Sequence, residues 1–257
     1  TAVNYNRDVE VFPVVKRILE KITGGDSFYR SPTDMGVNRA GFSIVEDAVA
    51  RSAAQKEILR RYFRYRCEYA MGLTNQETVQ RVELLMKDFD IRDEDRLVVL
   101  PAHAAAQKAR EANKGNEGIY CGAAIELRDG TVITGNNSPL MHAASILVLN
   151  AVKHLADIPD KIKLLPKVIT DSVRNLKTDI LNERSTSFDL EETLIALSIS
   201  AATNSAAQLA IDKLKELRNC EAHMTHIPTP GDETGLRRLG INLTSEPNFS
   251  TKNLYIL

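Results

Sequence analysis

Residues 119–134 read IYCGAAIELRDGTVIT, and their pattern predicts paired strands of a sheet. Two apolar runs, 119–127 and 131–134, are separated by Arg128-Asp129-Gly130. An Asp-Gly pair between two such runs is a strong signal for a tight turn between antiparallel strands. We therefore predict a β-hairpin here, followed by a helix over 138–156.

Helical patterns lie on both sides of this hairpin. Before it, we predict helices over 43–71, from a capping box at Thr74 and Glu77 to residue 89, and over 98–113. After it, helices fit 161–182, 189–217 (broken near Asn204) and 232–239, with strands at 220–226 and 241–244. Strands interleaved with helices favour layered α/β packing. We expect a mixed α/β fold with a helical subdomain over 43–116 and an α/β subdomain over 117–257, preceded by a segment over 1–42.

Composition excludes several classes of function. The chain has 257 residues, of which 43% are hydrophobic and 26% charged, and its 33 basic and 34 acidic residues nearly cancel. No net field favours nucleic acid or a membrane surface, and no apolar run approaches membrane-spanning length. We expect neither as a partner. Three widely spaced cysteines favour reduced thiols and a cytoplasmic location.

The densest group of chemically active side chains is Cys220-Glu221-Ala222-His223-Met224-Thr225-His226. In a strand, side chains alternate between faces, so Glu221 and His223 share one face while His226 lies on the other. This separation disfavours zinc, and we assign no metal ligands. Two hypotheses remain: polar groups that cap a strand end, or a substrate contact in which His223 acts as an acid or base.

The hairpin followed by a helix is similar to the core of the zinc nucleoside deaminases. That chemistry needs a His or Cys ligand, a Glu two residues later and a Cys-x-x-Cys pair. Here Ala144 stands where the Glu should follow His142, and the chain has no Cys-x-x-Cys. We therefore reject deaminase chemistry and predict that His142 is a surface or packing residue at a helix start.

Three further polar stretches could bind an anion, although each has a structural alternative. Hydroxyls and an amide in 197–205 either allow close helix packing or supply donors at a helix terminus. The N-terminal group around Arg7 is either a solvated loop or a fork for phosphate or carboxylate. The Ser31-Pro32-Thr33-Asp34 stretch has the composition of a turn.

The strings TAVNYNRDVEVFPV, SPTDMGVN, ALSISAATN, CEAHMT and LGINLT, with Glu246-Pro247, closely resemble a bacterial family of uncharacterised proteins catalogued as domain of unknown function 1846. The resemblance is to the C-terminal half of that family and covers essentially the whole chain. It implies a helical subdomain joined to an α/β subdomain of deaminase-like topology. It also implies a missing N-terminal half, similar to a nucleotide-binding domain, with a Gly-rich loop that this chain lacks.

The resemblance carries specific positions over to this sequence. The expected catalytic residues are His223, Glu221 and Asp8. The expected ligand-binding residues are Asn4, Asn6, Arg7, Thr33, Asp34, Asn38, Ser198, Ser200, Thr203 and Asn204. His226 departs from the family string, which further disfavours a metal at this strand.

Two functions of different classes follow. The first is the C-terminal part of a cytoplasmic enzyme that binds a phosphorylated small molecule or nucleotide at the junction with the missing half. ATP or another nucleotide with Mg²⁺ would bind through that half, and the reaction would be phosphoryl or nucleotidyl transfer, or hydrolysis. The second is a non-catalytic oligomerisation or regulatory module. We expect a homo-oligomer.

Overall fold

The computed structural model describes residues 18, 21–22, 24, 47–183 and 185–251. The chain divides into two compact units, Thr1–Asp95 and Arg96–Leu257. The fold is mixed α/β, as predicted. The helix expected over 98–113 belongs to the second unit, whereas the sequence grouped it with the helical subdomain.

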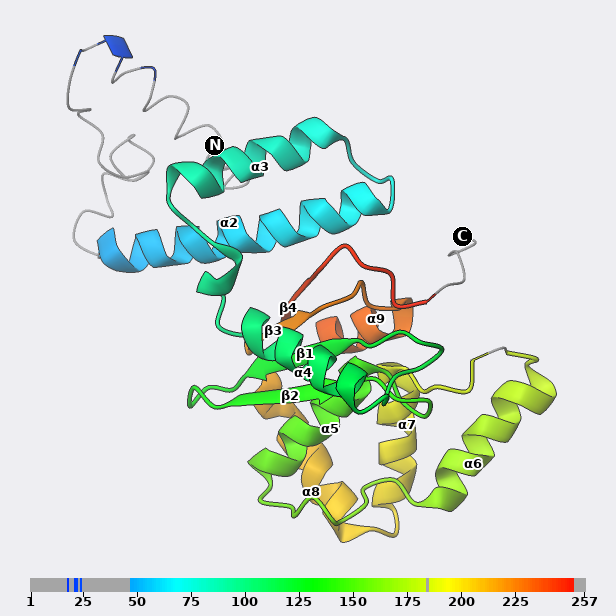
Figure 1. The fold of residues 1–257 in the computed structure, drawn as a ribbon. Coiled ribbons are helices and arrows are strands. Elements are labelled where there is room, and N and C mark those ends of the chain that lie inside the picture. Colours follow the sequence, from blue (N-terminus) through cyan, green and yellow to red (C-terminus); the bar gives the residue numbers. More distant parts are fainter. Residues whose placement is uncertain (1–17, 19–20, 23, 25–46, 184, 252–257) are drawn as a thin grey trace, which may run out of the picture. The chain divides into compact units, whose positions relative to one another are not determined.

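Residues 47–95 of the first unit form an antiparallel helix pair. It comprises α2 (Asp47–Ala70), α3 (Gln76–Asp88) and the short 3₁₀ helix η3 (Asp93–Asp95) (Figure 1). Apolar side chains of α2 and α3 are buried, as expected for amphipathic helices that pack on each other. The N-cap of α3 is Asn75, whose side chain accepts a hydrogen bond from the Thr78 amide, and not the predicted Thr74.

The second unit is built on a four-stranded sheet in the order β2-β1-β3-β4. Its strands are β1 (Gly122–Glu126), β2 (Val132–Asn136), β3 (Glu221–Met224) and β4 (Asn242–Ser245). The β1–β2 pair is the predicted hairpin, and Gly130 in its turn has a φ of 84°, which favours glycine. Strand β1 is antiparallel to β3, and β3 is parallel to β4.

Helices cover both faces of this sheet (Figure 1). One face, on which Ala124 packs with Val98 and Ala102, lies against α4 (Val99–Glu111). The opposite face, which carries Ala123 and Ile125, forms the main core with α5 (Ala143–Leu155), α7 (Leu190–Ala201), α8 (Ser205–Lys213) and α9 (Pro230–Arg238). Because side chains alternate along β1 and β3, each residue of these strands faces either α4 or the main core.

Helix ends differ from the sequence predictions where side chains cap the backbone. Helix α5 begins at Ala143 and not at 138, because the Ser138 hydroxyl accepts hydrogen bonds from the Leu140 and Met141 amides in a turn. The helix predicted over 161–182 is shorter: α6 (Lys167–Asn175) continues into one π-helical turn, η4 (Leu176–Ile180). The expected break near Asn204 separates α7 from α8, and a 3₁₀ turn, η5 (Leu214–Leu217), ends that region. Within the described residues, no helix is long and apolar enough to cross a membrane.

Candidate metal centre

Strands β3 and β4 place His223 beside Thr244 on the sheet face covered by α4. The two residues are register partners, and His223 Nδ1 lies 2.9 Å from the Thr244 hydroxyl oxygen. Ala124 is the partner of His223 on β1, and it belongs to the small apolar cluster with α4. The His223 side chain is fully buried in this layer.

Arg96 supports this strand pair through hydrogen bonds to both strands. Its Nε donates to Thr244 Oγ1 at 2.8 Å, and its Nη1 donates to Glu221 Oε2 at 2.7 Å. Its Nη2 donates to the backbone carbonyls of Ala222 and Asn242. Arg96 is itself buried, so one guanidinium joins both parallel strands in a site that excludes water.

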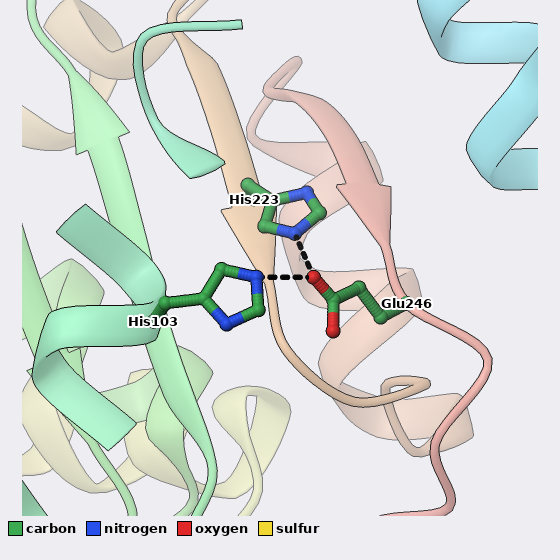
Figure 2. A group of neighbouring side chains, drawn as sticks. All are labelled: His103, His223 and Glu246. Atoms are coloured by element: carbon green, nitrogen blue, oxygen red, sulfur yellow. Dashed lines mark ion pairs between the residues drawn. The ribbon is translucent and has the colours of Figure 1, made fainter. Parts of the chain in front are cut away.

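Two further elements bring polar atoms to His223. His103 lies on α4, and Glu246 follows directly after β4. Glu246 Oε1 lies 2.5 Å from His103 Nε2 and 3.5 Å from His223 Nε2 (Figure 2). One ligand atom from each of the three residues lies within 4.8 Å of the others. We call these three residues the His103–His223–Glu246 cluster.

The electrostatics favour a neutral His223 beside an ionised Glu246. Burial lowers the pKa of His223, and electrostatic interactions with Arg96 and His103 act in the same direction, against the hydrogen bond and charge of Glu246. Burial raises the pKa of Glu246, but its contacts with His223 and His103 outweigh this and leave the pKa below its ordinary value. A neutral imidazole and a carboxylate are the protonation states that bind metal ions.

The hydrogen bonds around Thr244 accommodate the His223 tautomer that a metal at Nε2 requires. The Thr244 hydroxyl has one proton, and the Ala222 carbonyl, 3.3 Å away, can only accept it. The hydroxyl oxygen then accepts from Arg96 Nε–H and from His223 Nδ1–H. In this tautomer Nε2, 3.5 Å from Glu246 Oε1, would carry the lone pair that binds a metal ion, as in metal sites where the second imidazole nitrogen donates to a protein oxygen, whereas without a metal an Nε2–H tautomer donates to the Glu246 carboxylate.

The predicted residues of the Cys220 stretch separate into different roles. Glu221 shares a face with His223, as the alternation predicts, but its carboxylate accepts from Arg96 and from Asn242 Nδ2. His226 lies beyond β3, with Nδ1 2.9 Å from the Thr225 hydroxyl. Cys220 is buried, and its thiol contacts the Glu216 carbonyl.

The other predicted ligand-binding residues do not join this cluster. Ser200 donates to the Leu164 carbonyl, and Asn204 is the N-cap of α8, while Ser198 and Thr203 are exposed. All four lie at the end of α7 and the α7–α8 junction, away from β3 and β4 in Figure 1. The remaining predicted positions, Asn4, Asn6, Arg7, Asp8, Thr33, Asp34 and Asn38, lie outside the described residues.

Sequence reasoning missed His103 and Glu246 as members of the site. A histidine within an alanine-rich helix, and a glutamate directly after a short strand, are weak signals when taken singly. The parallel pairing of β3 and β4 was the missing information, because the carboxyl ends of parallel strands meet at one edge of a sheet. With that pairing, Glu246 follows two residues after the partner of His223.

Comparison with known proteins gives two family models and a set of close relatives. The model described as "Domain of unknown function DUF1846, C-terminal" matches residues 94–255, and that described as "Domain of unknown function DUF1846, N-terminal" matches residues 1–90. Their boundary lies next to the division between the two compact units. A "UPF0371 protein" of Clostridium botulinum (strain Alaska E43 / Type E3) is 49% identical over 253 residues, which are 98% of this chain and 50% of that protein. A "UPF0371 protein" of Clostridium tetani is 47% identical over 254 residues, 99% of this chain and 50% of that protein.

The chain therefore spans about half the length of the curated relatives it matches. The His103–His223–Glu246 cluster lies within the part matched by the C-terminal model.

Proposed function

The chain belongs to the DUF1846 family, and we propose that it contributes a divalent-metal centre, formed by His103, His223 and Glu246, to a hydrolytic or group-transfer enzyme. The observation that carries this proposal is the convergence of three ligand atoms within 4.8 Å from three separate elements. Two histidines and one glutamate are a ligand set of catalytic zinc sites, which keep the fourth position for water or substrate.

The separations suit a first-row ion after one local change. Ligands about 2.0–2.2 Å from a tetrahedral ion lie roughly 3.3 Å apart, close to the 3.5 Å between His223 Nε2 and Glu246 Oε1. The 2.5 Å between His103 and the same oxygen is a hydrogen-bond length. Metal binding would replace that shared proton, and the half-exposed His103 side chain would have to rotate away from Glu246 to admit the ion.

Such an ion would lower the pKa of its bound water and polarise a phosphoryl or carbonyl oxygen. Thr244 and Arg96 would not bind the ion themselves. Thr244 would orient His223 through its hydrogen bond to Nδ1, and Arg96 would hold Thr244 in place. A phosphorylated small molecule or nucleotide remains our proposed substrate class, on the basis of the resemblance alone. A nucleotide with Mg²⁺ in the other half is likewise proposed from the resemblance. We also propose a homo-oligomer, and we propose a cytoplasmic location from the three widely spaced cysteines. Three free thiols, all buried, are compatible with that location.

Metal titration of the full-length protein tests the centre. After treatment with a chelator, the protein is titrated with Zn²⁺ and Co²⁺ by calorimetry, and the d–d absorption of Co²⁺ reports its coordination geometry. We expect one ion per chain at this site and tetrahedral-type Co²⁺ bands. His103→Ala and Glu246→Gln change partly exposed side chains, so both variants are expected to fold. Each should weaken the affinity for the metal ion at least about tenfold. His154→Ala, which changes an exposed histidine, is the matched control.

Tight binding that survives both His103→Ala and Glu246→Gln would place the metal elsewhere. Absence of binding would refute the centre itself. The substrate class needs a separate measurement, a thermal-shift screen of nucleotides and sugar phosphates on the metal-loaded full-length protein, because a ligand that binds the native state raises its melting temperature.

A further inference from the structure

A second polar site lies on the other face of the sheet. A cavity of about 210 Å³ opens beside the start of β1 and the end of β3, and Cys121 and Met224 form part of its wall. His142, at the start of α5, and Asp232, in the first turn of α9, also line it. This volume is many times the roughly 10–15 Å³ that one water molecule needs, which suits a small metabolite.

His142 and Asp232 form a hydrogen-bonded pair in this wall. His142 Nδ1 lies 2.8 Å from Asp232 Oδ2, although the two residues are 90 positions apart in the sequence. The Thr229 hydroxyl donates to the same carboxylate oxygen at 2.8 Å, and the Leu190 amide donates to Oδ1 at 2.9 Å. Asp232 is 2% exposed, so these donors fix the carboxylate in one orientation.

The orientation of Asp232 determines which nitrogen of His142 can meet a ligand. A carboxylate can only accept, so His142 Nδ1 donates to Asp232, and Nε2 is the nitrogen left for other contacts. The His142 side chain is 24% exposed, and the residue contributes to the cavity wall. This is the geometry of an acid–base histidine held by a buried carboxylate.

Protonated His142 and the first-turn amides of α5 are the features of this cavity that favour an anion, and they act against the negative charges of Asp232 and Glu117 in the same wall. Burial lowers the pKa of His142, but the hydrogen bond and charge of Asp232, together with the charge of Asp189, outweigh this and raise the pKa above its ordinary value. No side chain caps the start of α5, where Ala143, Ala144 and Ser145 are buried. The amides of a first helical turn favour negative charge. Burial raises the pKa of the Cys121 thiol to about 12, so this sulfur is no thiolate nucleophile at neutral pH.

We propose that this cavity binds a small metabolite through its carboxylate or phosphate group, with His142 Nε2 as the charged donor and Asp232 as the positioning residue. The ligand is independent of the metal centre, because the β-sheet separates the cavity from the His103–His223–Glu246 cluster. A substrate-derived anion or a regulatory metabolite would satisfy the same contacts.

Histidine-selective ¹⁵N NMR of the full-length protein tests this proposal. The metal is removed with a chelator, and inorganic phosphate and acetate are titrated separately against chloride at matched ionic strength. We expect a saturable shift of the His142 resonances with at least one of the two anions, and a rise in the pKa of His142 on binding. The probe that saturates distinguishes phosphate from carboxylate recognition.

Two variants separate direct contact from positioning. His142→Gln should abolish the saturable response, and Asp232→Asn should lower both the pKa of His142 and the anion affinity, the latter about tenfold, as loss of a charge-assisted hydrogen bond predicts. His154→Gln changes an exposed histidine on the same helix and should alter neither. If the His142 signals respond to both anions no more than to chloride, or if binding is unchanged in His142→Gln, the proposal is wrong.

Discussion

Arg96 Nε donates a hydrogen bond to Thr244 Oγ1 at 2.8 Å, and thereby links the first residue of the second unit to its last strand. The same guanidinium binds Glu221 and two strand carbonyls. Among the described residues, Arg96 is the side chain that donates the most hydrogen bonds to strands β3 and β4. Arg96 thus fixes the spacing of β3 and β4, on which the position of His223 relative to Glu246 depends.

We first predict that Arg96→Ala strongly destabilises the protein. Its removal leaves a partly buried carboxylate and two carbonyls without this donor, which typically costs about 3–5 kcal/mol of unfolding free energy. Arg96→Lys should recover only part of the loss, because an ammonium cannot reproduce the planar fork. Urea denaturation measures the difference, and the exposed Arg92→Ala is the control. Equal stability of the two alanine variants would contradict this role.

Second, Thr244→Val should weaken metal binding without unfolding the protein. The isosteric change removes the oxygen that accepts from His223 Nδ1, so the imidazole loses its fixed tautomer. Loss of such an outer contact typically costs 10–100-fold in metal affinity. Competition with a chelator measures the affinity. Thr244→Ser keeps the hydroxyl and should bind as wild type does; if it is as weak as the valine variant, packing and not the hydrogen bond is responsible.

Third, Gly122→Ala should displace α4 from the sheet. A Cβ at this position would overlap the Ala102 carbonyl and lie 2.5 Å from the Ala106 amide nitrogen, so the backbone of α4 must move. Overpacking of this kind costs roughly 1–3 kcal/mol. His103 moves with α4, so zinc affinity should fall together with the melting temperature. Ala104→Ser, which changes an exposed position of the same helix, should leave zinc affinity unchanged.

Fourth, the His142–Asp232 pair should stabilise the protein more at low pH than at high pH. The folded-state pKa of His142 lies above its ordinary value. Its contribution is therefore fully present below the unfolded-state pKa of about 6.5, and it is lost as the pH rises through the folded-state pKa. The difference in unfolding free energy between wild type and His142→Gln should thus shrink from pH 6 to pH 9. A difference that is constant with pH would indicate that packing, not charge, accounts for the contribution.

Fifth, the cysteines should resist alkylation in the native state. Cys67, Cys121 and Cys220 are free and buried, and burial raises the pKa of both Cys121 and Cys220. Thiolates are the reactive species, so iodoacetamide at pH 8 should label the protein only after denaturation. Mass spectrometry measures this. Rapid native labelling of Cys121 would show that its cavity is more open than the structure indicates.

Local sequence patterns determined most of the elements. The Asp-Gly turn predicts the β1–β2 hairpin, because few residues besides glycine adopt the positive φ found at Gly130. Apolar periodicity predicts the helices, with errors where a polar side chain such as Ser138 or Asn75 captures backbone amides. Strand alternation also predicts that Glu221 and His223 share a face, which they do.

The two candidate sites depend on contacts between residues that lie far apart in the sequence. His103, His223 and Glu246 are distributed over 144 positions of sequence, and His142 and Asp232 over 91, so no local pattern relates them. The His223–Thr244 pairing brings Glu246 near one histidine, while the packing of α4 against the small side chains of β1 brings the other. Sequence determines local geometry through turn and helix preferences. The meeting of distant polar groups depends instead on strand order and on which face of the sheet each helix covers.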